Sequence, residues 1–171
     1  MGIFKKKDSS RMTRKEIKIA ERHRDLIVKN QDIDGMLELT WDFIIALNEI
    51  LTNRCDYDPD KLKNKAQKNL LLCMMVHNFS QSTVILSLFD NYNNTDEIVN
   101  ALNEIGATRS AEIIKQVSDM IPKNGENFYD IADEKTQGLL DKIDDELSDS
   151  PDGNFHNLLR VYAEKHKKDL Y

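Results

Sequence analysis

An acidic segment near the C-terminus is the part of this chain whose residue types and spacing best suit binding or chemistry. Residues 126–152 contain ten Asp and Glu residues and only two cations, Lys135 and Lys142. On the helix that we predict for residues 130–148, carboxylates repeat along the axis by about 5–6 Å, which is comparable in scale to phosphate spacing on nucleic acid. This row predicts a surface that imitates a DNA backbone and binds a basic protein. The candidate contacts are Asp130, Asp133, Glu134, Asp141, Asp144, Asp145 and Asp149.

Rows of carboxylates also suit other roles. Paired carboxylates can act as a general acid and base, or bind Mg²⁺ through their oxygens. No pattern in the segment buries these acids or pairs them with a His or Lys that would tune a pKa, so we disfavour catalysis. From charge alone, the simplest interpretation is a solvated helix face that keeps the protein soluble.

A second candidate is a polar cluster inside an apolar stretch, formed by His77, Asn78, Ser80 and Gln81. These side chains could line a pocket. The interpretation we prefer is that they satisfy backbone groups where a helix breaks. Cys73 lies four positions before His77, which is the spacing of two metal ligands on one helix face. Zinc takes three or four ligands, so a buried thiol is the simpler interpretation.

Familiar catalytic signatures are missing from the sequence. It has no Gly-rich phosphate loop, no G-x-S-x-G elbow, no H-E-x-x-H and no C-x-x-C. We therefore predict no catalytic residue, no metal ligand and no cofactor. Two cysteines fit a reducing cytoplasm, and no stretch approaches the roughly 20 apolar residues of a membrane span. We expect a cytoplasmic protein without enzymatic activity.

Helices must position these candidates, because apolar residues recur at helical spacing and no segment of useful length alternates with period two. The length of 171 residues, 40% of them hydrophobic, suits one core. We predict an all-α fold, a compact bundle of about seven to eight helices. The run Leu70–Val76 is apolar all round and marks the central helix, and Leu139, Ile143 and Leu147 face inward from the acidic helix. The predicted helical segments are 13–30, 36–53, 60–77, 84–89, 95–105, 108–121, 130–148 and the segment that begins at 151.

Charge is distributed unevenly along the chain. Residues 1–24 contain nine Lys and Arg residues and three acidic ones, although the whole chain has a formal net charge of -6. We predict a flexible basic arm at 1–12, a loosely docked or oligomerising charged helix at 13–30, and a helical domain at 36–171. The arm has two apolar residues beside three lysines, so weak contact with a membrane surface is an alternative to a disordered tail. The acidic body should repel DNA, so we expect no direct DNA binding.

The order of several segments resembles the bacterial DNA-mimic protein (DMP) domain family. The central family motif N-G-G-F-x-Q corresponds to the polar cluster, where His77-Asn78 replaces the glycine pair. The run from Ala101 to Ala107 matches the family's A-L-x-x-I-G-A helix. The other matching segments are Trp41-Asp42-Phe43-Ile44, the apolar helix 67–76, Phe79-Ser80-Gln81, Phe89-Asp90-Asn91, Phe128-Tyr129-Asp130 and the helix 139–147.

This resemblance implies an all-α domain without enzymatic activity. For the characterised kind it also implies a dimer that presents acidic side chains, as a DNA-like surface, to a helix-turn-helix regulator. The family-motif residues that it singles out here are His77, Asn78, Phe79, Gln81 and Asn91. A fold hosts many functions, so membership alone does not establish mimicry.

The sequence therefore favours a protein that binds a basic or DNA-binding protein through acidic helix surfaces. One alternative is an immunity protein or antitoxin that neutralises a cognate toxin. Others are a small enzyme or metal protein that uses the 77–81 cluster, and a structural module recruited by its N-terminal arm.

Overall fold

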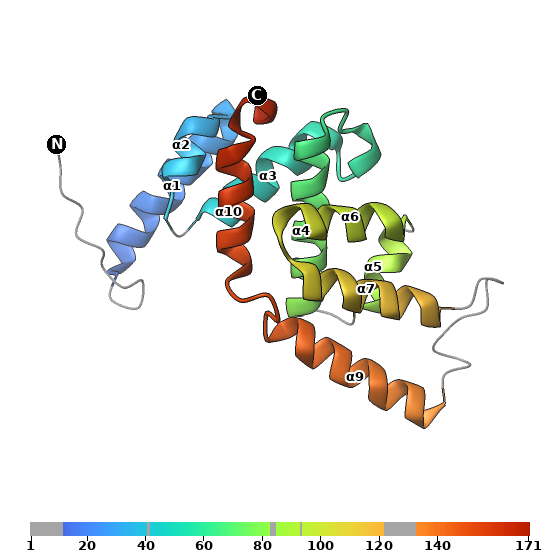
Figure 1. Cartoon of the computed structure of the whole chain (residues 1–171). Coiled ribbons are helices and arrows are strands. Elements are labelled where there is room, and N and C mark those ends of the chain that lie inside the picture. Colours follow the sequence, from blue (N-terminus) through green and yellow to red (C-terminus); the bar gives the residue numbers. More distant parts are fainter. Residues whose placement is uncertain (1–11, 41, 83–84, 93, 122–132) are drawn as a thin grey trace.

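The computed structural model describes residues 12–40, 42–82, 85–92, 94–121 and 133–171, and the regular structure in these ranges is entirely helical (Figure 1). The all-α fold class predicted from the sequence is confirmed. The longer helices are α1 (Arg14–Asn30), α3 (Phe43–Cys55), α4 (Lys65–Ser82), α6 (Thr95–Ile105), α7 (Thr108–Met120), α9 (Glu134–Ser148) and α10 (Phe155–Lys165). The shorter elements are α2 (Ile33–Glu38), α5 (Leu86–Asn91) and the 3-10 helices η2 (Pro59–Lys61) and η3 (Lys167–Leu170).

Helix α4 lies at the centre of the bundle. It packs against α3, α6, α9 and α10, and Figure 1 shows these helices around it. Leu70, Leu72 and Met74 are at most 1% exposed, although they point in different directions around the helix. A helix that is apolar all round must be covered on every side. The predicted position of the most buried helix is therefore confirmed.

Helix α4 begins later than the sequence predicts. The sequence predicts a helix from about residue 60, but the carboxylate of Asp58 accepts from the N–H of Asp60 and caps only the short η2. The longer helix starts at Lys65, where the side chain of Asn64 accepts from the N–H of Ala66 at 2.9 Å. Two caps in succession therefore divide this region into a 3-10 turn and a long helix.

Helix α4 also runs on further than predicted. It continues through Ser82, so the expected break at residues 78–81 is wrong. The hydroxyl of Ser80 donates to the carbonyl oxygen of His77 at 2.8 Å, which satisfies a polar side chain without ending the helix. The polar cluster is therefore part of a helix surface and not of a loop.

The single helix predicted for residues 36–53 is two helices, α2 and α3. Between them, the guanidinium of Arg160 on α10 donates to the carbonyl oxygen of Leu37 at 2.7 Å and to that of Leu39. The same group lies 4.2 Å from the ring centroid of Phe43. These carbonyls belong to the end of α2, where the last carbonyl oxygens of a helix have no N–H partner within the helix. Arg160 supplies the missing donors and allows the chain to turn.

Helices α6 and α7 pack closely against each other across a short connection. Gly106 ends α6 in the left-handed region at φ 90°, which is the usual conformation of a glycine C-cap. The N-cap of α6 is Asn94, whose side chain accepts from the N–H of Glu97, and the helix begins at Thr95, the first residue of the predicted segment 95–105. The apolar residues of α6 that follow the spacing i, i+3, i+4 and i+7 are all buried: Ile98, Ala101, Leu102 and Ile105.

Helix α9 packs one face against α4 and α7. Ile143 and Leu147 are buried, as predicted, but Leu139 is 39% exposed and the neighbouring Leu140 is buried in its place. The spacing of the buried residues is then i, i+3 and i+7, which is one regular helical stripe. The predicted inward position of Leu139 is wrong by one residue, so the polar face of α9 is also rotated from the predicted one.

Gly138 in the middle of α9 provides a test of this geometry. A Cβ atom built at this position meets nothing within 4 Å, so Gly138→Ala removes the entropic cost of glycine without a clash. We expect the free energy of unfolding to rise by about 1 kcal/mol and Tm to rise by about 2–4 °C. Gly153, at φ 85°, is the matched control: Gly153→Ala should lower Tm, and a lower Tm for Gly138→Ala would contradict the structure.

Candidate protein-binding surface

The outer face of α9 carries three acidic side chains in a line. Glu134, Asp141 and Asp145 are exposed and lie opposite the buried stripe of the helix. We call these three residues the α9 acidic line. It spans residues 134–145, or roughly 16 Å along the helix axis. Among the described residues, none of the three forms an ion pair, so their charges face the solvent, and the two lysines of the same helix, Lys135 and Lys142, are exposed as well.

Two further predicted contacts lie at the ends of α9. Asp133 is the N-cap, and its carboxylate accepts from the N–H of Thr136 at 2.8 Å. Hydrogen bonds from Thr136 lower the pKa of Asp133, so this exposed group stays charged. Asp149 follows the last turn and is also exposed. Both residues therefore add exposed carboxylates at the two ends of α9.

Asp144 has a different environment from the other predicted contacts. It is half-buried, and its carboxylate accepts from the backbone N–H of Ile85, before α5, at 3.0 Å. Burial raises its pKa, and repulsion from Asp141 and Asp145 adds to this effect. Asp144 therefore holds α9 to the rest of the bundle. The remaining predicted contact, Asp130, lies outside the described residues.

The raised pKa of Asp144 makes stability depend on pH. The carboxyl group of Asp144 binds its proton more tightly in the folded protein than in the unfolded chain. The free energy of unfolding therefore falls as pH rises from the ordinary aspartate pKa to the raised pKa of the folded protein. Asp144→Asn keeps an oxygen that accepts from Ile85 but removes the charge. We expect it to stabilise the protein by about 0.5–1 kcal/mol at pH 7, because water partly screens this group, and to have no effect near pH 3. Thermal unfolding at pH 7 and pH 3 measures the change in stability that Asp144→Asn causes, and Asp119→Asn, at an exposed position, is the control. An equal change in stability at the two pH values would contradict the prediction.

Two residues that the sequence did not single out fix the position of α9. Asp152 follows α9 and accepts from the N–H groups of Arg109 and Ser110 at 2.7 and 2.9 Å, which caps α7. The guanidinium of Arg109 in turn forms two hydrogen bonds to the carboxylate of Glu146, at 2.6 and 3.2 Å. These contacts join residues about 40 positions apart, so no local sequence pattern could reveal them.

The polar cluster lies beside the junction of α4 and α10. His77 stacks on the ring of Phe155, and its Nε2 atom lies 3.0 Å from Nε2 of His156. Burial lowers the pKa of His77, and the neighbouring His156 lowers it further. Gln81 donates to the carbonyl oxygen of Ser148 at 3.1 Å and so joins the ends of α4 and α9.

The other family-motif residues have ordinary environments. Asn78 is exposed and Phe79 packs against the core, while the side chain of Asn91 lies outside the described part. Burial raises the pKa of the Cys73 thiol, which is fully buried. In the described ranges, no three His, Cys, Asp or Glu residues lie together as a metal site would require.

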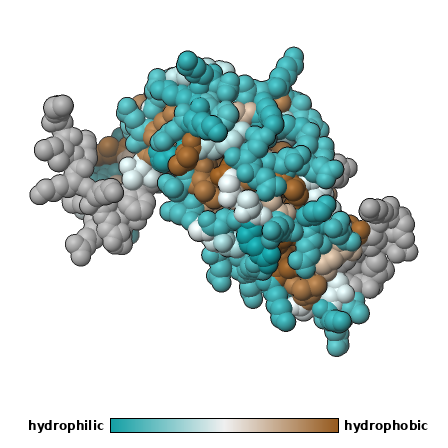
Figure 2. Space-filling view, in the orientation of Figure 1, coloured by the Kyte–Doolittle hydropathy of each residue, from teal (hydrophilic) through white to brown (hydrophobic). Residues whose placement is uncertain are grey.

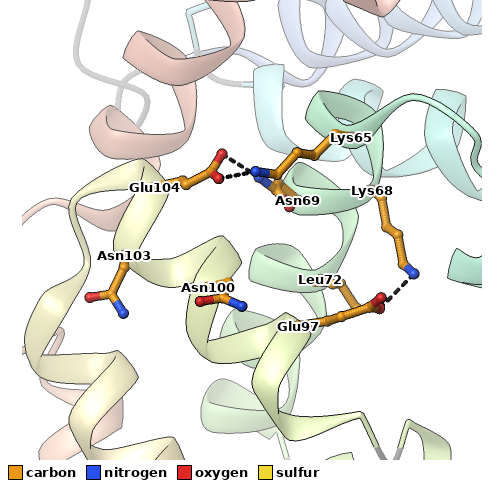
Figure 3. A pocket seen from close by; sticks show the side chains of 8 residues that line it. All are labelled: Lys65, Lys68, Asn69, Leu72, Glu97, Asn100, Asn103 and Glu104. Carbon is orange, nitrogen blue, oxygen red and sulfur yellow. Dashed lines mark hydrogen bonds and ion pairs between the residues drawn. The ribbon is translucent and has the colours of Figure 1, made fainter.

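A pocket of about 670 Å³ opens between α4 and α6, and Figure 3 shows its lining. Its charged side chains are paired with one another: Lys65 with Glu104, and Lys68 with Glu97. Burial alone would lower the pKa of Lys68, but its hydrogen bonds to carboxylates outweigh burial and raise it. The hydrogen bond from Lys65 lowers the pKa of Glu104. These internal pairs balance the charge, so the pocket attracts ionic ligands less than the exposed α9 acidic line does.

Comparison with models of protein families finds a match. The sequence model described as DMP19-like protein matches residues 62–166, which is more than half of the chain. The chain belongs to the DMP19-like family. Its family segment runs from α4 through α10 and includes both the α9 acidic line and the polar cluster, whereas α1, α2 and α3 precede it. The resemblance inferred from the sequence motifs is confirmed.

Two further comparisons were made for this DMP19-like protein. A search of curated proteins and a search of solved structures each returned no significant match. In the part that the structure describes, no helix is both long enough and apolar enough to span a membrane. Figure 2 shows a visible face covered mostly by hydrophilic residues, with hydrophobic residues in small patches between them.

Proposed function

We propose that this DMP19-like protein is a non-enzymatic cytoplasmic protein that binds the basic surface of another protein through α9. The observation that supports the proposal is the α9 acidic line, Glu134, Asp141 and Asp145, which is exposed and forms no ion pair with the described residues. Charges of one sign on a rigid helix attract a surface of the opposite sign and orient it before contact. DNA mimicry is the most specific form of this proposal.

In the DNA-mimic form, the partner is a DNA-binding protein and α9 occupies its DNA-binding surface. Rigidity supports this role, since a row of carboxylates replaces phosphates well only when its spacing is fixed. Asp144 ties α9 to the N–H of Ile85, and Glu146 ties it to Arg109. These two acids hold the helix in place, while the acids of the line form no ion pair within the part of the chain that the structure describes.

A cationic toxin is the second partner class, because the same carboxylates would bind a basic toxin surface. The protein would then act as an immunity protein or antitoxin. The two partner classes differ in an observable way, since only a DNA-binding partner should be released from this protein by duplex DNA.

An affinity capture from native lysate tests the proposal. The wild-type protein is immobilised at low salt beside a Glu134→Gln/Asp141→Asn/Asp145→Asn bait, and proteins eluted by a salt step are identified by mass spectrometry. We expect a basic protein that the wild-type bait captures and the neutralised bait does not, because salt screens exposed charges. Equal capture by both baits would contradict the proposal. Light scattering of the same preparation tests the homodimer that the family resemblance implies.

A further inference from the structure

Helix α1 presents an outer face that the proposed function does not use. Positions 15, 19, 22, 26 and 29 are separated alternately by four and three residues, so they share one side of the helix. This α1 outer face consists of Lys15, Ile19, Arg22, Leu26 and Lys29. Its three cations are exposed, and Ile19 and Leu26 are 58% and 57% exposed.

The opposite side of α1 fixes the helix to the bundle. Ile27 is 4% exposed and packs toward α2 and α3. The N-terminus has a capping box, in which the N–H of Thr13 donates to the carboxylate of Glu16 at 2.7 Å and the N–H of Glu16 donates to the Thr13 hydroxyl. The helix is therefore already formed and anchored, and its outer face needs no folding before it binds.

The α1 outer face presents both cations and exposed aliphatic side chains, and few binding partners match both. Its cations need anions at the surface, and its two aliphatic side chains need an apolar layer just beneath. DNA offers phosphates but no layer that removes Ile19 and Leu26 from water. The α9 acidic line of a second copy offers carboxylates around Gly138 but no aliphatic side chain within the line. An anionic bilayer offers phosphates above acyl chains, in the order that this face requires.

We propose that the α1 outer face docks this protein on an anionic lipid surface. The helix lies on the bilayer and does not cross it, since its 17 residues include six cations. Figure 1 shows α1 and α9 at opposite ends of the molecule. A bilayer bound to α1 therefore leaves the α9 acidic line in solution, so the docking does not depend on the proposed partner and does not compete with it.

Vesicle co-sedimentation tests the proposal with the full-length protein. The probes are vesicles of phosphatidylcholine alone and of phosphatidylcholine with about 30% phosphatidylglycerol, at low salt. We expect binding to the anionic vesicles only. Lys15→Glu/Arg22→Glu/Lys29→Glu should weaken binding by at least about 100-fold, because each lost cation near such a surface contributes several-fold in affinity and each new carboxylate adds repulsion. Ile19→Asn/Leu26→Asn should weaken it by about 10-fold, because it removes the apolar contribution.

A matched control separates the α1 outer face from net charge. Lys115→Glu/Lys142→Glu/Lys168→Glu changes the same number of exposed charges elsewhere, so it should keep most of the binding. Circular dichroism confirms that each variant is folded. The proposal would be overturned if the wild-type protein did not bind anionic vesicles. It would also be overturned if the α1 variants bound as well as the control, and that result would assign the binding to residues before α1. Equal loss in both triple variants would also overturn it, because net charge alone would then explain binding.

Discussion

Neutralising the α9 acidic line is expected to lower the affinity of this protein for its captured partner by about 30-fold at low salt. The variant is Glu134→Gln/Asp141→Asn/Asp145→Asn, in which each amide has nearly the size of the acid it replaces. Three exposed charges that meet a basic surface contribute about 2 kcal/mol together, which corresponds to the expected change in Kd. The difference should shrink as salt is added, because the Debye length falls below the separation of the charges. Isothermal titration calorimetry at several salt concentrations measures both effects.

The control for this prediction neutralises three exposed acids on other helices. Asp96→Asn/Asp119→Asn/Glu164→Gln makes the same change in net charge without touching α9. We expect its Kd to stay within about threefold of the wild-type value, since screened charges at a distance contribute little. If both triple variants lose affinity equally, the interaction depends on net charge and α9 is not the binding surface.

Replacing Arg160 is expected to produce the largest loss of stability among the variants considered. Arg160→Met keeps much of the aliphatic length but leaves the carbonyl oxygens of Leu37 and Leu39 without their charged donor. It also removes the guanidinium from its position 4.2 Å from the centroid of Phe43. Hydrogen bonds from a charged donor contribute about 1.5–3 kcal/mol, and the ring contact adds about 0.5–1 kcal/mol. We expect a loss of about 3 kcal/mol and a fall in Tm of about 6–12 °C.

Arg160→Lys provides the comparison for this prediction. Lysine keeps the charge but is a point donor, and it does not bond two carbonyls with one planar group. Its Tm should therefore lie between those of the wild type and Arg160→Met, as measured by thermal unfolding at pH 7. An Arg160→Met protein as stable as the wild type would show that the junction of α2 and α3 does not depend on α10.

Much of the fold could be predicted because its signals are local. The uninterrupted apolar run Leu70–Val76 permits only a buried central helix, and a glycine after a helical stripe, such as Gly106, predicts a left-handed C-cap. The DMP19-like family was recognised for the same reason, from short motifs in a fixed order. In these regions, local spacing and global packing favour the same structure.

The remaining features depend on contacts between distant residues. The boundary between α2 and α3 is set by Arg160, more than 120 positions along the chain. Leu139 and Leu140 are adjacent and equally apolar, so only the packing of α9 decides which is buried. The acids of α9 look alike in sequence, yet Asp144 holds a backbone N–H while Asp145 faces solvent. A charge pattern can indicate a surface, but it does not say which of its acids are already engaged.

Displacement of duplex DNA from the captured partner is the most direct test of the DNA-mimic proposal. The partner is bound to a fluorescent duplex, and wild-type protein is titrated in at low salt while anisotropy is recorded. The proposal predicts that the DNA is released, and that the variant neutralised at Glu134, Asp141 and Asp145 releases it only at about 30-fold higher concentration. Formation of a ternary complex, with the DNA still bound, would contradict it.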